Sequence, residues 1–354
     1  MSNGVKTTIG LVATAIVIAI SLGFISLFSF PLFTGWVSYC LLCIIPMEIV
    51  ASVTWGAQHP NFAGTLAQPA KGISFILVCL VAGMVVAPLQ FLMAGRAIGP
   101  PTPSPMLVMC TIVSVIITFW LAIMWGGWPF TKIIKNPIAA GLTMLVVCYL
   151  LNYLLFRIFF NYGFMRGAPV YVASLDPHGL FNAWYALVFY LAVIMIMFIS
   201  LNFDLWPFTS FPALMRQPIL GIVWTIVAFA LGGLCFYIGI GVLQMDVVSF
   251  MVRVPVPFIF GTIVVLNMMQ GSLFGNLKQP LKGVLNTAAS ATVGTLLALG
   301  YRAVAPLVTG VLQPGPPSYD YEIWLASALL GVTFPFLIFH AEFFKLWPLK
   351  KAEK

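Results

Sequence analysis

Ten apolar stretches, each about as long as a membrane-crossing helix, divide this chain from one end to the other. A helix needs about 20 mainly apolar residues to cross the ~30 Å hydrocarbon layer of a bilayer. Strands of a membrane barrel would alternate polar and apolar residues, whereas these stretches are apolar at odd and even positions alike. The sequence therefore predicts an all-α polytopic membrane protein with about ten transmembrane helices. The expected helices lie near residues 8–30, 36–54, 73–93, 106–125, 138–160, 183–203, 219–242, 258–275, 281–303 and 323–343.

Composition excludes a soluble fold. Only 7% of the residues are charged and 62% are hydrophobic, whereas soluble domains carry roughly 25% charged residues. The lipid bilayer is therefore the expected partner for most of the surface. The net charge of +8 comes from scattered residues that form no basic face, so nucleic acid is not an expected partner.

The lysines predict the orientation of the chain. All of them fall in the two termini or in loops that follow even-numbered helices. Because basic residues in short loops stay in the cytoplasm, we expect both termini to be cytoplasmic in a bacterial-type inner (plasma) membrane. The apolar run after Lys6 is longer than the roughly 7–15 residues of a secretory signal core, so it is expected to remain as the first helix. On the far side, proline-rich segments such as residues 254–257 are expected to form irregular loops.

A short phrase recurs where four of the helices begin. Residues 68–72, 136–141, 217–221 and 279–283 each contain Gln or Asn, then Pro, then Gly about one turn later. Proline is tolerated in the first turn of a helix, an amide before it can cap the helix, and glycine permits close helix contact. Each phrase therefore predicts the start of a helix that runs away from the lysine side.

Two further phrases predict an internal repeat. Trp-Pro ends three even-numbered helices, at residues 128–129, 206–207 and 347–348, and an Arg shortly before a Pro follows each outward-running helix. We therefore expect four parallel two-helix repeats over residues 36–305, flanked by a first helix in residues 1–35 and by a last helix with a basic tail in residues 306–354. All lie in one membrane domain. The alternative is that Trp, Pro and Gly only mark helix ends, as in most membrane proteins.

Ionisable and polar side chains inside the bilayer are the main candidates for function, because they are costly there. Glu48 is the clearest, about 10 Å in from the end of its helix. The ninth helix carries the most polar run, with Asn286, Ser290 and Thr292 among small residues. We expect Glu48 and this run to line the path of a small solute, with Arg157 as a further candidate. The alternative is that these groups only bond neighbouring helices.

Four arginines belong to the repeated phrase that ends the outward-running helices. If the repeats pack around one axis, Arg96, Arg166, Arg253 and Arg302 meet at the outer mouth and could hold an anion through forked hydrogen bonds. The favoured alternative is that each one pairs with a carboxylate on the same side or reaches the headgroups.

Catalytic and cofactor chemistry has little support in the sequence. Cys40 and Cys43 form a C-x-x-C pair, but their apolar surroundings favour buried thiols over redox work. The three histidines are scattered, and no His, Cys and carboxylate cluster has ligand spacing, so neither a metal nor any other cofactor is expected. Nucleotide-binding and hydrolase motifs are also missing from the sequence, which disfavours an enzyme.

These features favour a membrane transporter or channel for a small solute, with an anion as one candidate. The alternative is a haem-free, quinone-interacting or anchoring membrane subunit of an electron-transfer or enzyme complex. In that case, its partners would be other membrane or peripheral protein subunits.

Overall fold

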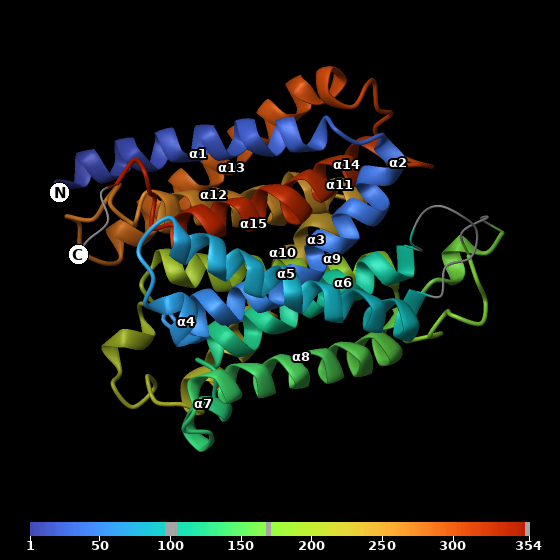
Figure 1. Ribbon diagram of the computed structural model, residues 1–354. Helices are drawn as coiled ribbons and strands as arrows, with labels where there is room; N and C mark the ends of the chain where they lie inside the picture. The colour runs from blue at the N-terminus through green and yellow to red at the C-terminus, as the bar shows by residue number, and fades with distance from the viewer. Residues whose placement is uncertain (96–102, 104, 168–170, 351–354) are drawn as a thin grey trace.

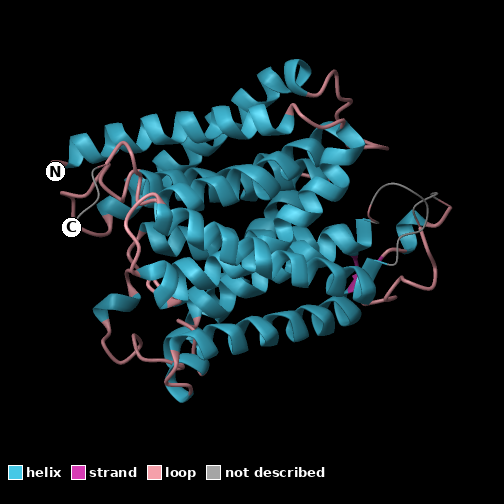
Figure 2. Ribbon diagram, in the orientation of Figure 1, coloured by secondary structure: helices cyan, strands magenta, loops and turns pink. Residues whose placement is uncertain are grey.

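The structure is a computed structural model that describes residues 1–95, 103, 105–167 and 171–350 (Figure 1). Its described part contains ten helical spans that are long and apolar enough to cross a membrane, which confirms the predicted helix class and number (Figure 2). The protein is therefore a multi-pass membrane protein. Numbered in chain order, spans 1 to 10 are Asn3–Ile25, Phe30–Thr54, Ala70–Ala94, Pro105–Met124, Pro137–Phe159, Ala183–Asn202, Ile219–Val242, Val247–Met268, Leu281–Val308 and Asp320–Phe343.

Four spans are single α-helices, namely α1 (span 1), α8 (span 5), α9 (span 6) and α13 (span 9). The other six combine α-helices with π-helical turns. Their segments are α2 Phe30–Leu32, η1 Phe33–Val37, α3 Ser38–Ile49 and η2 Val50–Thr54 in span 2; α5 Ala70–Gln90 and η3 Phe91–Gly95 in span 3; α6 Pro105–Phe119 and η4 Trp120–Met124 in span 4; α10 Ile219–Tyr237 and η7 Ile238–Val242 in span 7; α11 Val247–Arg253, α12 Pro255–Ile263 and η8 Val264–Met268 in span 8; and α14 Asp320–Ala326, η9 Ser327–Thr333, α15 Phe334–Ile338 and η10 Phe339–Phe343 in span 10.

Within the residues that the structure describes, the loops contain only short elements. These are the helical turns α4 Asn61–Gly64, α7 Phe130–Ile133, η5 Gly163–Met165 and η6 Phe208–Ser210, and the parallel two-residue strands β1 Phe160–Asn161 and β2 Phe181–Asn182.

The expectation of an irregular loop at residues 254–257 is wrong, because these residues lie inside span 8. Asp246 caps α11 by accepting a hydrogen bond from the Ser249 amide at 2.8 Å, so helix begins at Val247 and not near residue 258. Pro255 stands in the first turn of α12, where a missing N–H leaves no helical bond unmade. The chain bends at Val254 and continues as a helix.

The spans form two layers. In each even-numbered span, 61% to 83% of the residues in its most apolar 18-residue stretch are buried. The same share is 17% to 33% in the odd-numbered spans. In Figure 1, α1 and α8 lie at opposite edges of the bundle, with α12 and α15 between them. The even-numbered spans therefore form an inner layer, and the odd-numbered spans are available to lipid.

The inner spans form a closed ring. Span 2 contacts span 4, and contacts continue from span 4 to 6, from 6 to 8, from 8 to 10 and from 10 back to 2. Each outer span lies between two inner ones: span 3 between 2 and 10, span 5 between 4 and 2, span 7 between 6 and 4, span 9 between 8 and 6, and span 1 between 10 and 8. Every outer helix therefore covers one junction of the inner ring.

Aromatic rings fill the middle of the inner ring at one level. The ring of Phe119 on α6 lies 5.6 Å from that of Phe198 on α9 and 5.7 Å from that of Phe334 on α15. Phe334 also meets Phe260 on α12 at 6.4 Å. Because spans 4 and 10 are not neighbours in the ring, the Phe119–Phe334 contact crosses its centre. Aromatic side chains from four inner spans therefore meet inside the ring.

All five inner spans end in the same backbone turn at one end of the bundle. This end, which carries Lys6, Lys71, Lys132, Lys282 and Lys345, is called the lysine end below. Two consecutive residues with positive φ follow each inner span, at residues 56–57, 126–127, 204–205, 270–271 and 345–346. The second residue of each pair donates its N–H back to a carbonyl of the helix, as in Leu346 to His340 at 2.9 Å.

The repeated Gln-Pro phrase fastens outer helices to these turns. The Gln217 amide donates to the Met124 carbonyl at 3.1 Å, and its oxygen accepts from the Gly221 N–H at 3.0 Å. Gln68 bridges Phe343 and Gly72 in the same way, and Gln279 bridges Asn202 and Gly283. Each side chain thus satisfies a terminal carbonyl of an inner span and an N–H of an outer one. The predicted amide caps are confirmed.

The glycine of each phrase lies against the residue that precedes the turn. A Cβ on Gly221 would collide with the Trp125 ring, and a Cβ on Gly283 would collide with the Phe203 ring. Gly72 and Gly141 meet Phe344 and Trp55 in the same way, and Gly10 of span 1 meets the backbone of Met268 and Met269. The close helix contact predicted at the glycines of the four phrases is confirmed.

Candidate functional site

Glu48 is buried within the inner layer of the bundle. It lies on α3, is 0% exposed, and neither of its carboxyl oxygens has a hydrogen-bond partner in the described part of the chain. The Cys79 thiol of span 3 lies within electrostatic reach of the carboxyl group. An unpaired carboxylate would be very costly in such a place, so the carboxyl group must be neutral in this conformation. Glu48 can therefore hold a proton that it would release on meeting water.

A second group of buried polar side chains lies around Cys110. The Asn152 amide donates to the Cys110 sulfur at 3.4 Å, and the Cys110 thiol donates to the Gln90 oxygen at 3.6 Å. Tyr39 donates to the Ala87 carbonyl and also interacts with Cys43. The Cys110 cluster, defined as Tyr39, Cys43, Gln90, Cys110 and Asn152, therefore joins side chains from spans 2 to 5.

Three atoms in and beside the Cys110 cluster have no hydrogen-bond partner in the described part of the chain. They are Gln90 Nε2, Asn152 Oδ1 and the Tyr162 hydroxyl. Burial, with smaller contributions from Cys110 and Asp176, raises the pKa of the Tyr162 hydroxyl well above its usual value, so it stays a donor. Buried polar groups are normally paired. These atoms therefore leave two donors and an acceptor unpaired inside the bundle.

Asp176 ties the loop after span 5 over this cluster. Its carboxylate accepts hydrogen bonds from the Tyr162 N–H at 3.2 Å, the His178 N–H at 2.9 Å and the Tyr171 hydroxyl at 3.0 Å. The side chain is fully buried, although its His178 partner is 54% exposed. The loop therefore forms a hydrogen-bonded cover on the end of the bundle opposite the lysine end.

The polar residues predicted on the ninth helix are divided by the structure. Asn286 and Ser290 are buried against span 6, where the Asn202 amide donates to the Ser290 hydroxyl at 3.3 Å. Thr292 is exposed, and its hydroxyl donates to the Ala288 carbonyl of its own helix at 2.9 Å. Span 9 packs on spans 6 and 8, whereas Glu48 faces span 3. The structure does not bring Glu48 and span 9 together.

The arginines are likewise only partly gathered. Arg157 and Arg166 are exposed. The Arg302 guanidinium lies 5.8 Å from the Tyr321 ring centre, and Arg253 also interacts with Tyr321. Arg96 lies outside the described residues. The structure thus places two of the four predicted anion-binding arginines around one tyrosine.

The two cysteines of the C-x-x-C pair differ in exposure. Cys40 is exposed and Cys43 is buried, and both thiols are free. Among the described residues, no three His, Cys, Asp or Glu side chains come together as a metal site.

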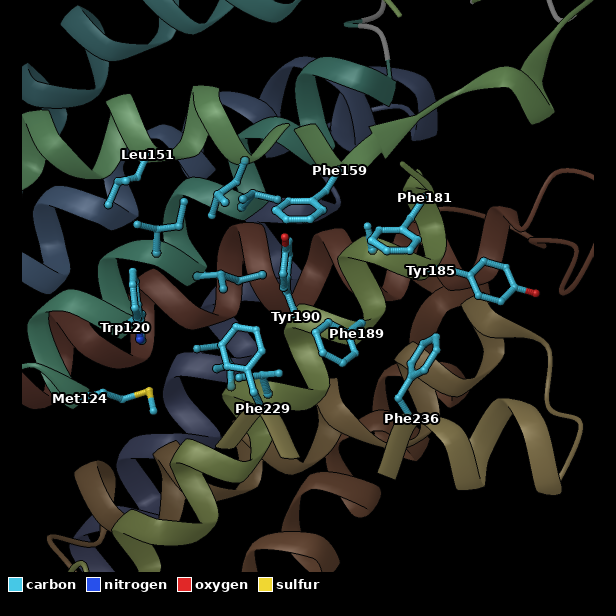
Figure 3. A pocket seen from close by; sticks show the side chains of 17 residues that line it. Trp120, Met124, Leu151, Phe159, Phe181, Tyr185, Phe189, Tyr190, Phe229 and Phe236 are labelled. Atoms are coloured by element: carbon cyan, nitrogen blue, oxygen red, sulfur yellow. The ribbon is translucent and has the colours of Figure 1, made fainter. Parts of the chain in front are cut away.

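An apolar groove of about 650 Å³ opens between α8 and α10, with α6 and α9 as its floor (Figure 3). Eight of the 17 side chains that line it are aromatic. Phe159 and Phe181 stack nearly parallel, at 6.0 Å and 8°. Figure 3 shows the Tyr190 hydroxyl inside the groove and the Tyr185 hydroxyl directed away from it.

Neither the Cys110 cluster nor the groove is predicted by the sequence. The cluster joins residues that are 20 and 42 positions apart, on helices whose contacts no sequence pattern reveals. One sequence feature does indicate an aromatic helix face at the groove. Tyr185 and Phe189 are four residues apart and therefore share a face of their helix. No family model, no curated protein and no solved structure matches this chain.

Proposed function

We propose that this protein is a membrane carrier for a small hydrogen-bonding solute, and that proton binding at Glu48 is coupled to transport. The observation that supports it most is the complete burial of a carboxyl group with both oxygens unpaired. A carboxyl group that is neutral when buried and ionises when hydrated changes charge as the protein changes conformation. This difference links proton binding to the conformational equilibrium.

The proposal places the solute at the Cys110 cluster. Its unpaired groups include Gln90 Nε2 and Asn152 Oδ1, which a solute with an acceptor and a donor would satisfy. The cluster and Glu48 share span 2, so a movement of this helix would affect both. Pro46 and the π-helical turn η2 lie on either side of Glu48, and both weaken the regular helical bonding of span 2.

We further infer that the inner and outer spans are five two-helix units arranged in a ring. Units 1 to 4 are the repeats expected from sequence, and span 10 with span 1 supplies a fifth. The support is the recurring contact of an outer-helix glycine with the residue before an inner-span turn, which includes Gly10 at Met269.

The proposal places the lysine end in the cytoplasm of a bacterial-type plasma membrane. A protease-sensitive tag fused to either end of the chain is therefore expected to resist protease added to intact cells and to be cut after lysis. Cleavage of either tag in intact cells would overturn this orientation. A tag inserted at exposed Leu180, in the loop at the opposite end, is the matched control and is expected to be cut without lysis.

The carrier proposal is tested in proteoliposomes that contain a pH-sensitive dye. Neutral amides, amino acids and small inorganic anions are added in turn, and one class is expected to move protons together with solute. Glu48→Gln is expected to lower this linked proton flux at least about 10-fold, because an amide cannot release a proton. Glu342→Gln removes a partly exposed carboxylate that bonds Asn267 and Lys345, and it is expected to retain the flux.

Two results would contradict the proposal. One is equal proton flux in Glu48→Gln and the wild type. The other is a lack of flux with every solute class from protein whose fold is intact by circular dichroism.

A further inference from the structure

The groove between α8 and α10 differs in chemistry from the Cys110 cluster, because it is apolar. It is lined by spans 4 to 7 and by Phe181 of β2, and it opens between the outer helices α8 and α10, which are available to lipid. Leu151 and Phe159 of α8 face the groove, whereas Asn152 and Phe156 of the same helix are buried on another face. The two sites therefore lie on different faces of α8.

The walls of the groove favour a flat ring. Phe159, Phe181 and Phe189 present aromatic surfaces to it, and offset or parallel stacking on such rings stabilises a conjugated ligand beyond simple burial. Its volume of about 650 Å³ is that of sites for drug-sized molecules. A single acyl chain has no flat surface to use this lining.

Tyr190 supplies a polar group in an otherwise apolar site. Figure 3 shows its hydroxyl inside the groove. No hydrogen bond joins this hydroxyl to another of the described residues. The neighbouring Trp120 N–H is already bound to the Thr225 hydroxyl at 2.8 Å. Tyr190 is therefore the donor that a ligand in the groove can use.

The depth of Tyr190 distinguishes between ligands. It lies seven residues into span 6, about 10 Å from the end of the helix. The ester and phosphate groups of a phospholipid stay near the membrane surface, so its chains would leave this hydroxyl unpaired. A ring carbonyl carried into the hydrocarbon layer would pair with it.

We propose that the groove binds a lipid-soluble molecule whose flat conjugated ring carries a carbonyl oxygen and a hydrocarbon tail, which is the chemistry of an isoprenoid quinone. The ring lies among Phe159, Phe181 and Phe189, and Tyr190 donates a hydrogen bond to the carbonyl. The tail leaves between α8 and α10 into the bilayer. This site stands independently of the carrier proposal.

The experiment uses the full chain in detergent and a benzoquinone with a ten-carbon tail. Binding is followed by quenching of tryptophan fluorescence, because Trp120 lines the groove. Tyr190→Phe is expected to weaken binding about 3- to 10-fold, the effect of losing one hydrogen bond. Tyr153→Phe makes the same change at an exposed tyrosine of α8 that does not line the groove, and it is expected to bind like the wild type.

A second probe separates the ring carbonyl from the tail. Decylbenzene, which has the tail and a ring but no carbonyl, is measured by competition and is expected to bind the wild type and Tyr190→Phe equally. The proposal is overturned if decylbenzene matches the quinone in the wild type, or if Tyr190→Phe and Tyr153→Phe bind the quinone alike. Glu48→Gln is expected to keep quinone binding, so failure of either proposal can be recognised separately.

Discussion

Replacing Gly294 with alanine is expected to destabilise the protein by about 3 kcal/mol, at the upper end of the cost of overpacking. A Cβ at this position would collide with the Pro257 carbonyl oxygen of α12, and a Cβ on Gly261 would collide with the Ser290 carbonyl oxygen of α13. Both obstacles are backbone atoms, so they can move only if the two helices separate. Helices α12 and α13 therefore pack through their backbones, and neither glycine can accept a methyl group.

The change in stability is measured as the thermal unfolding of purified protein in mild detergent. Gly300→Ala on the same helix is the matched control, because a Cβ there meets nothing within 4 Å. This control is expected to be neutral or to stabilise the helix by up to about 1 kcal/mol, since alanine favours helix more than glycine does. If Gly294→Ala and Gly300→Ala unfold at the same temperature, the close packing of α12 and α13 is not important for stability.

Span number and type could be predicted because hydropathy and length report directly on a bilayer-crossing helix. The division of the spans into an inner and an outer layer could not be predicted. Outer spans have mean hydropathies of 1.4 to 2.5 and inner spans of 1.8 to 2.6, so the two ranges overlap almost completely. In a membrane, lipid and protein interiors are similarly apolar, and hydropathy does not separate the surfaces that face them.

The start of span 8 was mispredicted for a local reason. Pro255 and Pro257 suggested a loop, but proline in the first turn of a helix removes no helical hydrogen bond. The helical span begins earlier, at Val247, where Asp246 is the N-cap. By contrast, the amides of Gln68, Gln217 and Gln279 were predicted correctly as caps. Their second bond, to an inner span far away in sequence, could not be predicted without the fold.

The candidate site was predictable only as single residues. Glu48 stands out in sequence because a carboxyl group in an apolar helix is rare and costly. Its isolation from partners, and the meeting of Gln90, Cys110 and Asn152, depend on how spans 2 to 5 pack. Neutral amides and thiols occur in many membrane helices, and their types alone do not indicate which of them meet.

Removing residues 1–27 is expected to abolish the folded protein, and attaching the same segment after the last helix is expected to restore it. Span 1 covers the junction of spans 8 and 10, where Gly10 lies on the Met268 backbone and the Thr7 hydroxyl is 2.8 Å from that of Ser272. Without it, that junction lacks the outer helix that covers each of the other four junctions. Ala13, Val17 and Ile25 would also no longer bury their side chains.

Reattachment is feasible because span 10 ends, and span 1 begins, at the lysine end. Span 2 likewise ends, and span 3 begins, at the lysine end. In the permuted chain, span 1 would therefore follow span 10 in the way that span 3 follows span 2, as the outer helix of a fifth unit. Folding is measured as a monodisperse peak in detergent together with a cooperative melt. The permuted chain with Gly10→Leu is the matched control, and it is expected to fail because the larger side chain collides with the Met268 carbonyl. A permuted chain that is no more stable than the deletion would contradict the five-unit ring, and so would a deletion that folds as well as the full chain.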